Sequence, residues 1–348
     1  MSTALAVLAG LAAAAIAHHL YWSWRLRVPP GDDELLRART DDGWELALGR
    51  RRPAGPRRAP PVLLLHGLAV NRLFLAFGRG SHSLAGRLAA AGLDCFTLDL
   101  RGHGSSRPGP GAPRDWTFDD YVRRDLPAAL DAVRAATGAP RALLLGHSQG
   151  ALLALAAAAL HADRVAGAVA IAGPVWYAPG PRLRRFARMA FRLRRVTRLL
   201  ARELAPFAGL LHPAAAQVPI ATRNVDRPLL RRMLANAVED VAGGVARQFR
   251  WWIREDLFRS LDGRDDYRAL LGACRQPALF LAGALDQLAP PEVVRRARDA
   301  WGGEAVYACA SRAAGLSADY GHGDLVFGRR APEEVYPLIR DWLLARTR

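Results

Sequence analysis

Short apolar runs alternate with longer helix-forming stretches along most of the chain. The runs lie at 61–65, 93–98, 142–145, 165–172 and 277–282. Continuous apolar runs of this kind are typical of parallel strands that are buried on both faces. Helices are expected between them, near 81–91, 117–136, 151–162 and 291–301. The alternation predicts an α/β fold with a mostly parallel sheet and helices on both faces.

A hairpin is expected before this alternating pattern, and one more strand and helix are expected at its end. Residues 34–40 and 44–50 flank Asp41-Asp42-Gly43, which predicts an antiparallel hairpin with an Asp-Gly turn. A strand near 304–309 and a helix near 332–346 are expected to complete the sheet and its cover.

The alternation stops between residues 175 and 272. This stretch contains no convincing strand, and its composition predicts several helices rich in Arg, Phe and Trp. We therefore expect an α/β core of residues 34–174 and 273–348, with residues 175–272 inserted as a helical cap.

The segment from Thr3 to Trp24 carries no formally charged residue and is long enough to cross a bilayer as a helix. The end of the segment carries Tyr21, Trp22 and Trp24, and Arg25 and Arg27 follow it, as at a membrane interface on the positive side. We expect residues 1–27 to form a retained membrane anchor that holds the rest of the chain in the cytoplasm. The alternative is a signal segment cleaved after Ala15-Ile16-Ala17, which would give a secreted or periplasmic protein.

The chain is strongly basic, with a formal net charge of +17. All 49 basic residues are arginines, and no RNA-binding, zinc-finger or helix-turn-helix pattern accompanies them. We expect no nucleic-acid partner. The three cysteines, Cys95, Cys274 and Cys309, have no CxxC spacing, so neither a disulfide framework nor a metal site is expected, and no cofactor motif was identified.

Gly146-His147-Ser148-Gln149-Gly150 matches the pattern G-x-S-x-G. This pattern needs a strained strand-to-helix turn that exposes the serine hydroxyl above a sheet, and glycines that allow close backbone approach. An apolar strand precedes the motif and an alanine-rich helix follows it. The context predicts Ser148 as a nucleophile.

A serine nucleophile needs a general base and an acid that orients it, in the chain order serine, acid, histidine for this kind of turn. His322 lies in a Gly-flanked loop between the last strand and the last helix and is the expected base; His161 and His212 are expected to be structural. Asp286 follows the strand at 277–282 and is the expected acid. Asp319 and Asp324 are too close to His322 in sequence to be comfortable partners.

Acyl transfer also needs backbone N–H donors for the developing oxyanion. The amide of Gln149 follows the nucleophile directly, and the amide of Leu68 lies in the loop after strand 61–65. These two are the expected oxyanion hole. His66 is expected to shape that loop by hydrogen bonding rather than to act as the base.

Five motifs occur in order: His66-Gly67, the run from Asp99 to Ser106, GHSQG, GALDQLAP and YGHGDLVFG. Together they resemble the α/β-hydrolase superfamily, and the stretches at 83–102 and 322–336 resemble its acid lipase branch of lysosomal and gastric lipases. The resemblance implies a serine hydrolase with an α/β-hydrolase fold that cleaves esters of lipophilic substrates beneath a helical cap. It also implies that Asp99 and Arg101 are structural.

Other activities are compatible with the same three residues. An acyltransferase, or a hydrolase of lactones or C–C bonds, would use Ser148, Asp286 and His322 as well, and a non-catalytic binding protein would retain the fold alone. Residues 182–204 could form a basic amphipathic helix on anionic lipid, or a cap helix with one apolar face. Phe249, Trp251 and Trp252 could line an acyl pocket or pack the cap.

Overall fold

The computed structural model describes residues 3–177, 180–210 and 220–346. An α/β body contains a mixed sheet in the order β1-β2-β4-β3-β6-β7-β8-β9, with β5 beside β2. The strands are β1 (Glu34–Arg39), β2 (Trp44–Arg51), β3 (Val62–Leu65), β4 (Cys95–Asp99), β5 (Arg107–Pro108), β6 (Ala142–His147), β7 (Val165–Ile171), β8 (Ala278–Gly283) and β9 (Ala305–Ala310). From β4 to β9 all neighbours are parallel, whereas β1 and β2 form the antiparallel edge. The predicted α/β class is confirmed.

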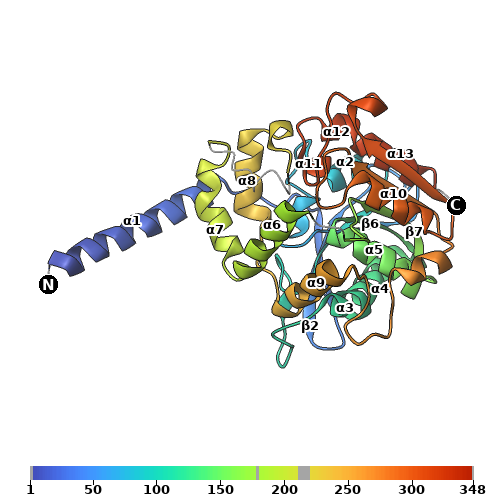
Figure 1. Ribbon diagram of the computed structural model, residues 1–348, viewed down its shortest axis with the longest axis horizontal. Helices are drawn as coiled ribbons and strands as arrows, with labels where there is room; N and C mark the ends of the chain where they lie inside the picture. Colours follow the sequence, from blue (N-terminus) through green and yellow to red (C-terminus); the bar gives the residue numbers. More distant parts are fainter. Residues whose placement is uncertain (1–2, 178–179, 211–219, 347–348) are drawn as a thin grey trace.

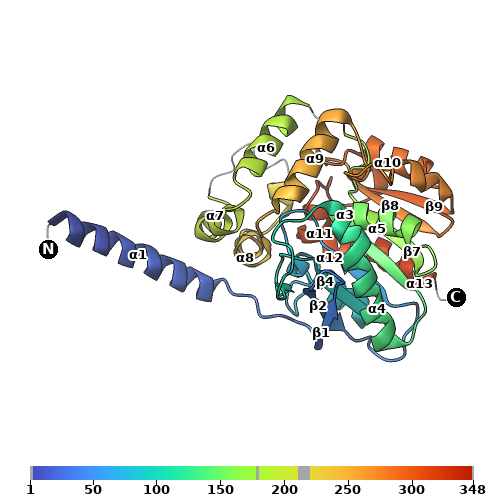
Figure 2. The ribbon, with the colours of Figure 1, turned by 90° about the horizontal axis from the view of Figure 1, so that it is seen from below.

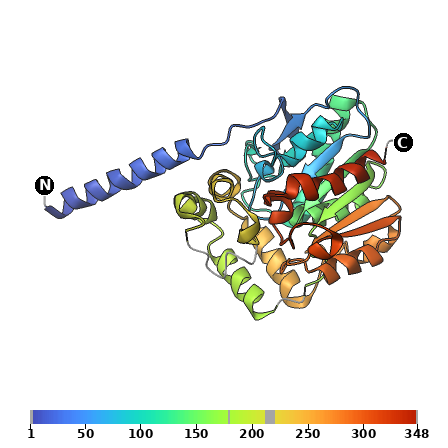
Figure 3. The ribbon, with the colours of Figure 1, turned by 90° about the horizontal axis from the view of Figure 1, so that it is seen from above.

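Helices cover both faces of the sheet (Figures 2 and 3). They are α2 (Leu84–Ala90), α3 (Phe118–Asp120), α4 (Leu126–Thr137), α5 (Gln149–Leu160), α10 (Pro291–Asp299), α11 (Asp324–Phe327), α12 (Ala331–Glu334) and α13 (Tyr336–Leu344). The helix expected at 117–136 is present as one continuous helical run, in which a π-helical turn at Tyr121–Asp125 joins α3 to α4. The helix expected at 332–346 is interrupted at Val335, between α12 and α13.

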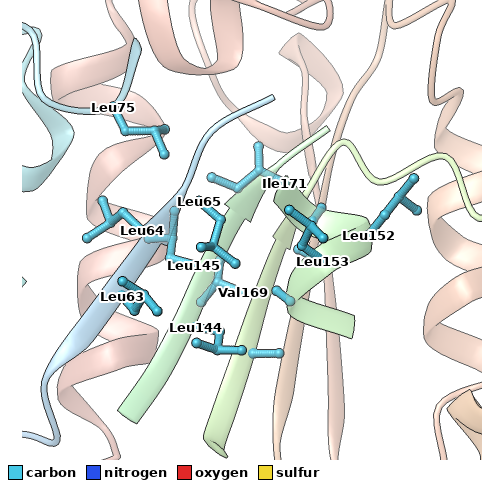
Figure 4. Close-up of a cluster of buried hydrophobic side chains, with 14 of the residues drawn as sticks. Leu63, Leu64, Leu65, Leu75, Leu144, Leu145, Leu152, Leu153, Val169 and Ile171 are labelled. Atoms are coloured by element: carbon cyan, nitrogen blue, oxygen red, sulfur yellow. The ribbon is translucent and has the colours of Figure 1, made fainter. Parts of the chain in front are cut away.

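The central core lies between β3, β6, β7 and α5 (Figure 4). Leu64, Leu145 and Val169 are fully buried on adjacent strands, and Leu152 and Leu153 are fully buried on α5. Alanine fills most of the remaining α5 positions, so this helix can lie close to the strands. The core therefore fixes β6 and α5 on either side of Ser148.

Between β7 and β8 the described residues contain only helices and loops: α6 (Pro181–Arg192), α7 (Thr197–Leu204), α8 (Arg227–Ala237), α9 (Gly243–Glu255) and short 3-10 turns. The single helix considered for 182–204 was wrong, because the chain breaks between α6 and α7. Phe249 and Trp252 of α9 pack edge-on against the buried Phe118, which favours the packing interpretation for these two aromatic residues.

Helix α1 (Thr3–Arg25) projects away from the body (Figure 1). None of its residues is buried, and it is the one described helix long and apolar enough to cross a membrane. Its carboxyl-terminal end contacts α7, where His19 Nδ1 bonds to the carboxylate of Glu203 and His18 stacks on Phe207.

Two buried arginine–aspartate pairs hold the loops at the ends of β3 and β4. Arg72 Nε donates to Asp99 at 3.1 Å, and Arg101 Nε donates to Asp125 at 2.7 Å. Burial raises the pKa of Asp99 to about 6 and that of Asp125 to about 7, although both arginines oppose the shift. Asp99 and Arg101 thus have structural contacts of the kind that the resemblance implies.

Candidate active site

Ser148 stands at the sharp turn between β6 and α5, with φ +56° and ψ −117°. An L-residue rarely adopts this conformation, so the surrounding contacts must hold it. Its amide donates to Ile171 O at 2.8 Å. A Cβ at Gly146 would lie 1.9 Å from Gly150 O, and a Cβ at Gly150 would lie 2.0 Å from Leu65 O. Both glycines of the motif are therefore required by close backbone approach.

Asp286 and His322 are hydrogen bonded. His322 Nδ1 lies 2.8 Å from Asp286 Oδ2, and both side chains are buried. The other carboxylate oxygen, Oδ1, accepts the amides of Leu288 at 2.8 Å and Ala289 at 2.9 Å. A carboxylate fixed in this way can hold one imidazole tautomer, with the proton on Nδ1 and the lone pair on Nε2.

The loops that carry the acid and the histidine meet at the end of β8. The amide of Leu285 donates to Tyr320 O at 2.7 Å. A Cβ at Gly283 would lie 2.6 Å from the same carbonyl oxygen, so glycine is needed where the two loops approach. This contact explains how residues 36 positions apart form one pair.

His147 forms a hydrogen bond with the loop that carries His322. Its Nε2 lies 3.0 Å from His322 O, and the two rings are 4.8 Å apart. Because a carbonyl oxygen only accepts, Nε2 carries the proton. Burial lowers the pKa of His147 to about 3, with a smaller contribution from His322, so this ring is neutral beside the catalytic candidate. The sequence motif contained His147 but gave no signal of this contact.

The loop after β3 passes next to the nucleophile. A Cβ at Gly67 would lie 3.4 Å from Ser148 Cβ. Within the described part of the chain, the amides of Leu68 and Gln149 donate no hydrogen bond to another protein group. His66 accepts the amide of Leu100 through Nε2 at 3.2 Å and contacts Gly67 O through Nδ1 at 2.9 Å, and burial lowers its pKa to about 3. His66 is a neutral hydrogen-bonding residue of the loop.

The rival residues have other partners. His161 Nε2 bonds to Val122 O at 3.0 Å, and Asp319 accepts the amide of Arg312 at 2.9 Å. Asp324 accepts the amide of Gly321 at 2.8 Å and also bonds to Asn224 from the helical segment. It therefore holds the loop of His322 rather than its ring. His212 lies outside the described residues.

No cluster of three or more His, Cys, Asp or Glu among the described residues is arranged to hold a metal ion. The three thiols are unpaired, and burial raises the pKa of Cys95 and that of Cys274, the latter to about 11.

The sequence of this chain matches a known protein family. The family model described as alpha/beta hydrolase fold matches residues 60–322, and the chain belongs to that family.

Among curated proteins, human Lipase member K is 28% identical over 223 residues, which is 59% of this chain and 53% of that protein. Human gastric triacylglycerol lipase is 30% identical over 141 residues, or 37% of this chain and 34% of that protein. The chain therefore spans about a third to a half of the length of these curated relatives.

Solved structures share the fold over most of the chain. A thermophilic esterase from Thermogutta terrifontis has a TM-score of 0.61 at 21% identity, covering 90% of this chain and 100% of that one. A membrane phospholipase A has a TM-score of 0.57 at 20% identity, covering 98% and 96%. At these identities the likeness establishes the architecture and nothing finer.

Proposed function

We propose that this protein hydrolyses carboxylic esters through an acyl-enzyme on Ser148. The observation that carries the proposal is the buried Asp286–His322 hydrogen bond, in a loop whose His322 carbonyl bonds to His147, the residue before the serine in nucleophile-elbow geometry. His322 Nε2 removes the proton from Ser148 Oγ as Oγ attacks the ester carbonyl, and the same proton passes to the departing alkoxide. A water molecule, deprotonated by His322, then attacks the acyl-enzyme, and the serine hydroxyl is regenerated.

The amides of Leu68 and Gln149 are proposed to stabilise the oxyanion in both tetrahedral intermediates. Support comes from their positions: Gln149 follows the nucleophile at the start of α5, and Leu68 follows Gly67, which lies against Ser148. Removal of one such donor typically costs about 10²–10³ in kcat.

The proposed substrates are lipophilic acyl esters. The relatives that support this class are named lipases, among them a gastric triacylglycerol lipase, and the helical segment of residues 175–272 is proposed to act as a cap over the site. We propose the same division of the chain into anchor, core and cap as the sequence predicts. The run of helices between β7 and β8 supports the cap, and the projecting α1 supports the anchor.

The protein is further proposed to be anchored in a membrane by α1, with the catalytic body on the cytoplasmic side. Helices α6, α7 and α8 lie on the side of the body from which α1 leaves (Figures 1 to 3). Leu199 and Leu204 of α7 and the nearby Phe207 are exposed, and residues 182–204 carry nine arginines against a single acidic residue, Glu203. Exposed apolar and basic groups in this combination suit an anionic leaflet.

A chain-length series of p-nitrophenyl esters, from acetate to palmitate, tests the substrate class. We expect activity in the wild type that rises beyond acetate, and no activity in Ser148→Ala. Ser81→Ala is a matched control, because within the described residues the hydroxyl of this exposed serine contacts just the neighbouring His82. A preference for acetate over every longer chain would contradict the lipophilic assignment. Recovery of the mature protein without residues 1–17 would contradict the anchor.

A further inference from the structure

The oxyanion loop is held in an unusual backbone conformation. Ala69, next to Leu68, has φ +59°, a region that residues other than glycine rarely occupy. Such a conformation persists only where neighbouring contacts over-determine it. The contacts that hold Ala69 therefore also set the direction of the Leu68 amide.

Those contacts come from the segment that follows α8. The amide of Glu239 donates to Ala69 O at 2.9 Å, and the amide of Asn71 donates to Ala237 O at 2.9 Å. Val70 and Val238 form an isolated antiparallel bridge between them. The loop is thus paired, over three residues, with the segment proposed as the cap.

The buried side chain of Glu239 stabilises this pairing through hydrogen bonds. It is 4% exposed, and its Oε1 accepts from Asn71 Nδ2 at 2.8 Å and from the amide of Gly104 at 3.3 Å. Asn71 in turn accepts the amide of Leu73 at 3.0 Å and donates to Asn236 O at 2.9 Å. One buried carboxylate therefore joins the loops that follow β3 and β4.

The other carboxylate oxygen of Glu239 faces α7. Arg198 lies 3.4 Å from Oε2, and the amide of Arg198 donates to Asp240 at 3.0 Å. Helix α7 also carries Glu203, which bonds to the end of α1. Helix α7 thus makes polar contacts both with the end of α1 and with Glu239, which holds the oxyanion loop.

We propose that Glu239 is a positioning residue that aligns the Leu68 amide toward the oxyanion and makes this alignment depend on the placement of α7. The proposal rests on the ester-hydrolase function above. Glu239 acts through Asn71 and Ala69 and touches no reacting atom. Displacement of α7 moves the oxyanion donor without altering Ser148, Asp286 or His322.

The test uses the full-length protein and a short p-nitrophenyl ester, with rates expressed per active site titrated by a fluorophosphonate. Glu239→Ala leaves Asn71 without its buried acceptor, and we expect kcat to fall by about tenfold to a hundredfold with KM changed less than about twofold. Glu239→Gln keeps an oxygen for Asn71 and is expected to restore most of kcat. Glu255→Ala is the matched control, because this exposed carboxylate bonds to the neighbouring Arg254 on α9 and has no contact with the oxyanion loop or α7 in the part of the chain described, and it is expected to match the wild type.

Asn71→Ala gives a second measurement that does not depend on the folding of Glu239→Ala. It should reproduce the loss of kcat, and the double variant should lose no more than the worse single variant, because both changes break one contact. An unchanged kcat per titrated site in Glu239→Ala, or a raised KM with constant kcat, would overturn the proposal. A wild-type protein without any esterase activity would instead refute the proposed function.

Discussion

Replacement of Asp286 by Asn separates the role of its charge from the role of its shape. The carboxylate accepts three hydrogen bonds, two from backbone amides to Oδ1 and one from His322 to Oδ2. An asparagine keeps its oxygen on the two amides and presents its NH₂ group to His322 Nδ1. Because Nδ1 must then accept, the proton moves to Nε2, and His322 can no longer take a proton from Ser148.

We expect Asp286→Asn to lower kcat by about 10⁴-fold, or about 5 kcal/mol of transition-state stabilisation, with little change in KM. The isosteric change keeps both amide hydrogen bonds and reverses the direction of the third, so the melting temperature should shift by only a few degrees. The assay is p-nitrophenyl butyrate hydrolysis across pH, with thermal unfolding on the same samples.

Asp319→Asn is the control for the rival acid near His322. Asp319 accepts the amide of Arg312, and its replacement should leave kcat within about twofold of the wild type. If Asp286→Asn retained more than a tenth of kcat, or if Asp319→Asn caused the larger loss, the assignment of the acid would be wrong.

Three further predictions concern folding, pH and the membrane. Gly150→Ala places a Cβ 2.0 Å from Leu65 O and should cost about 3 kcal/mol or more in urea unfolding, whereas Gly80→Ala, with open space around it, should be neutral. His66 and His147 stay neutral to about pH 3 in the folded state, but they protonate below about pH 6.5 when unfolded. The free energy of unfolding should therefore fall by about 2 kcal/mol per histidine between pH 7 and pH 5, and urea titrations showing no loss over this range would contradict the burial argument. In anionic vesicles, a fluorophore at Leu204→Cys should be quenched by lipid-borne quenchers while one at Leu338→Cys on α13 should not; equal quenching would contradict the proposed orientation of α7.

The strands of the core could be predicted from the sequence because buried parallel strands are apolar on both faces. Val62–Leu65, Ala142–His147 and Ala278–Gly283 are fully buried, so each appears as a continuous apolar run between polar turns. The position of the nucleophile could also be predicted, because the turn at Ser148 tolerates only glycine at two flanking positions and so leaves a recognisable motif.

The side-chain contacts around the site could not be predicted from the sequence. Glu239 and Asn71 meet across 168 residues, and neither lies in a periodic pattern or a motif. The helix expected over 182–204 was broken because Val196 and its neighbours make a turn that no glycine or proline marks. Long-range polar contacts of this kind depend on tertiary packing, which a local pattern does not encode.

The central claim is that Ser148 is the nucleophile of a working Asp286–His322 pair, and active-site labelling tests it most directly. Folded wild-type protein is treated with a fluorophosphonate, ester hydrolysis is followed, and the modified peptide is identified by mass spectrometry. We predict a single adduct on Ser148 that forms in proportion to the loss of activity and is strongly slowed in His322→Asn. Ester hydrolysis that persists after complete labelling of Ser148, or folded active protein in which Ser148 stays unmodified, would contradict the account.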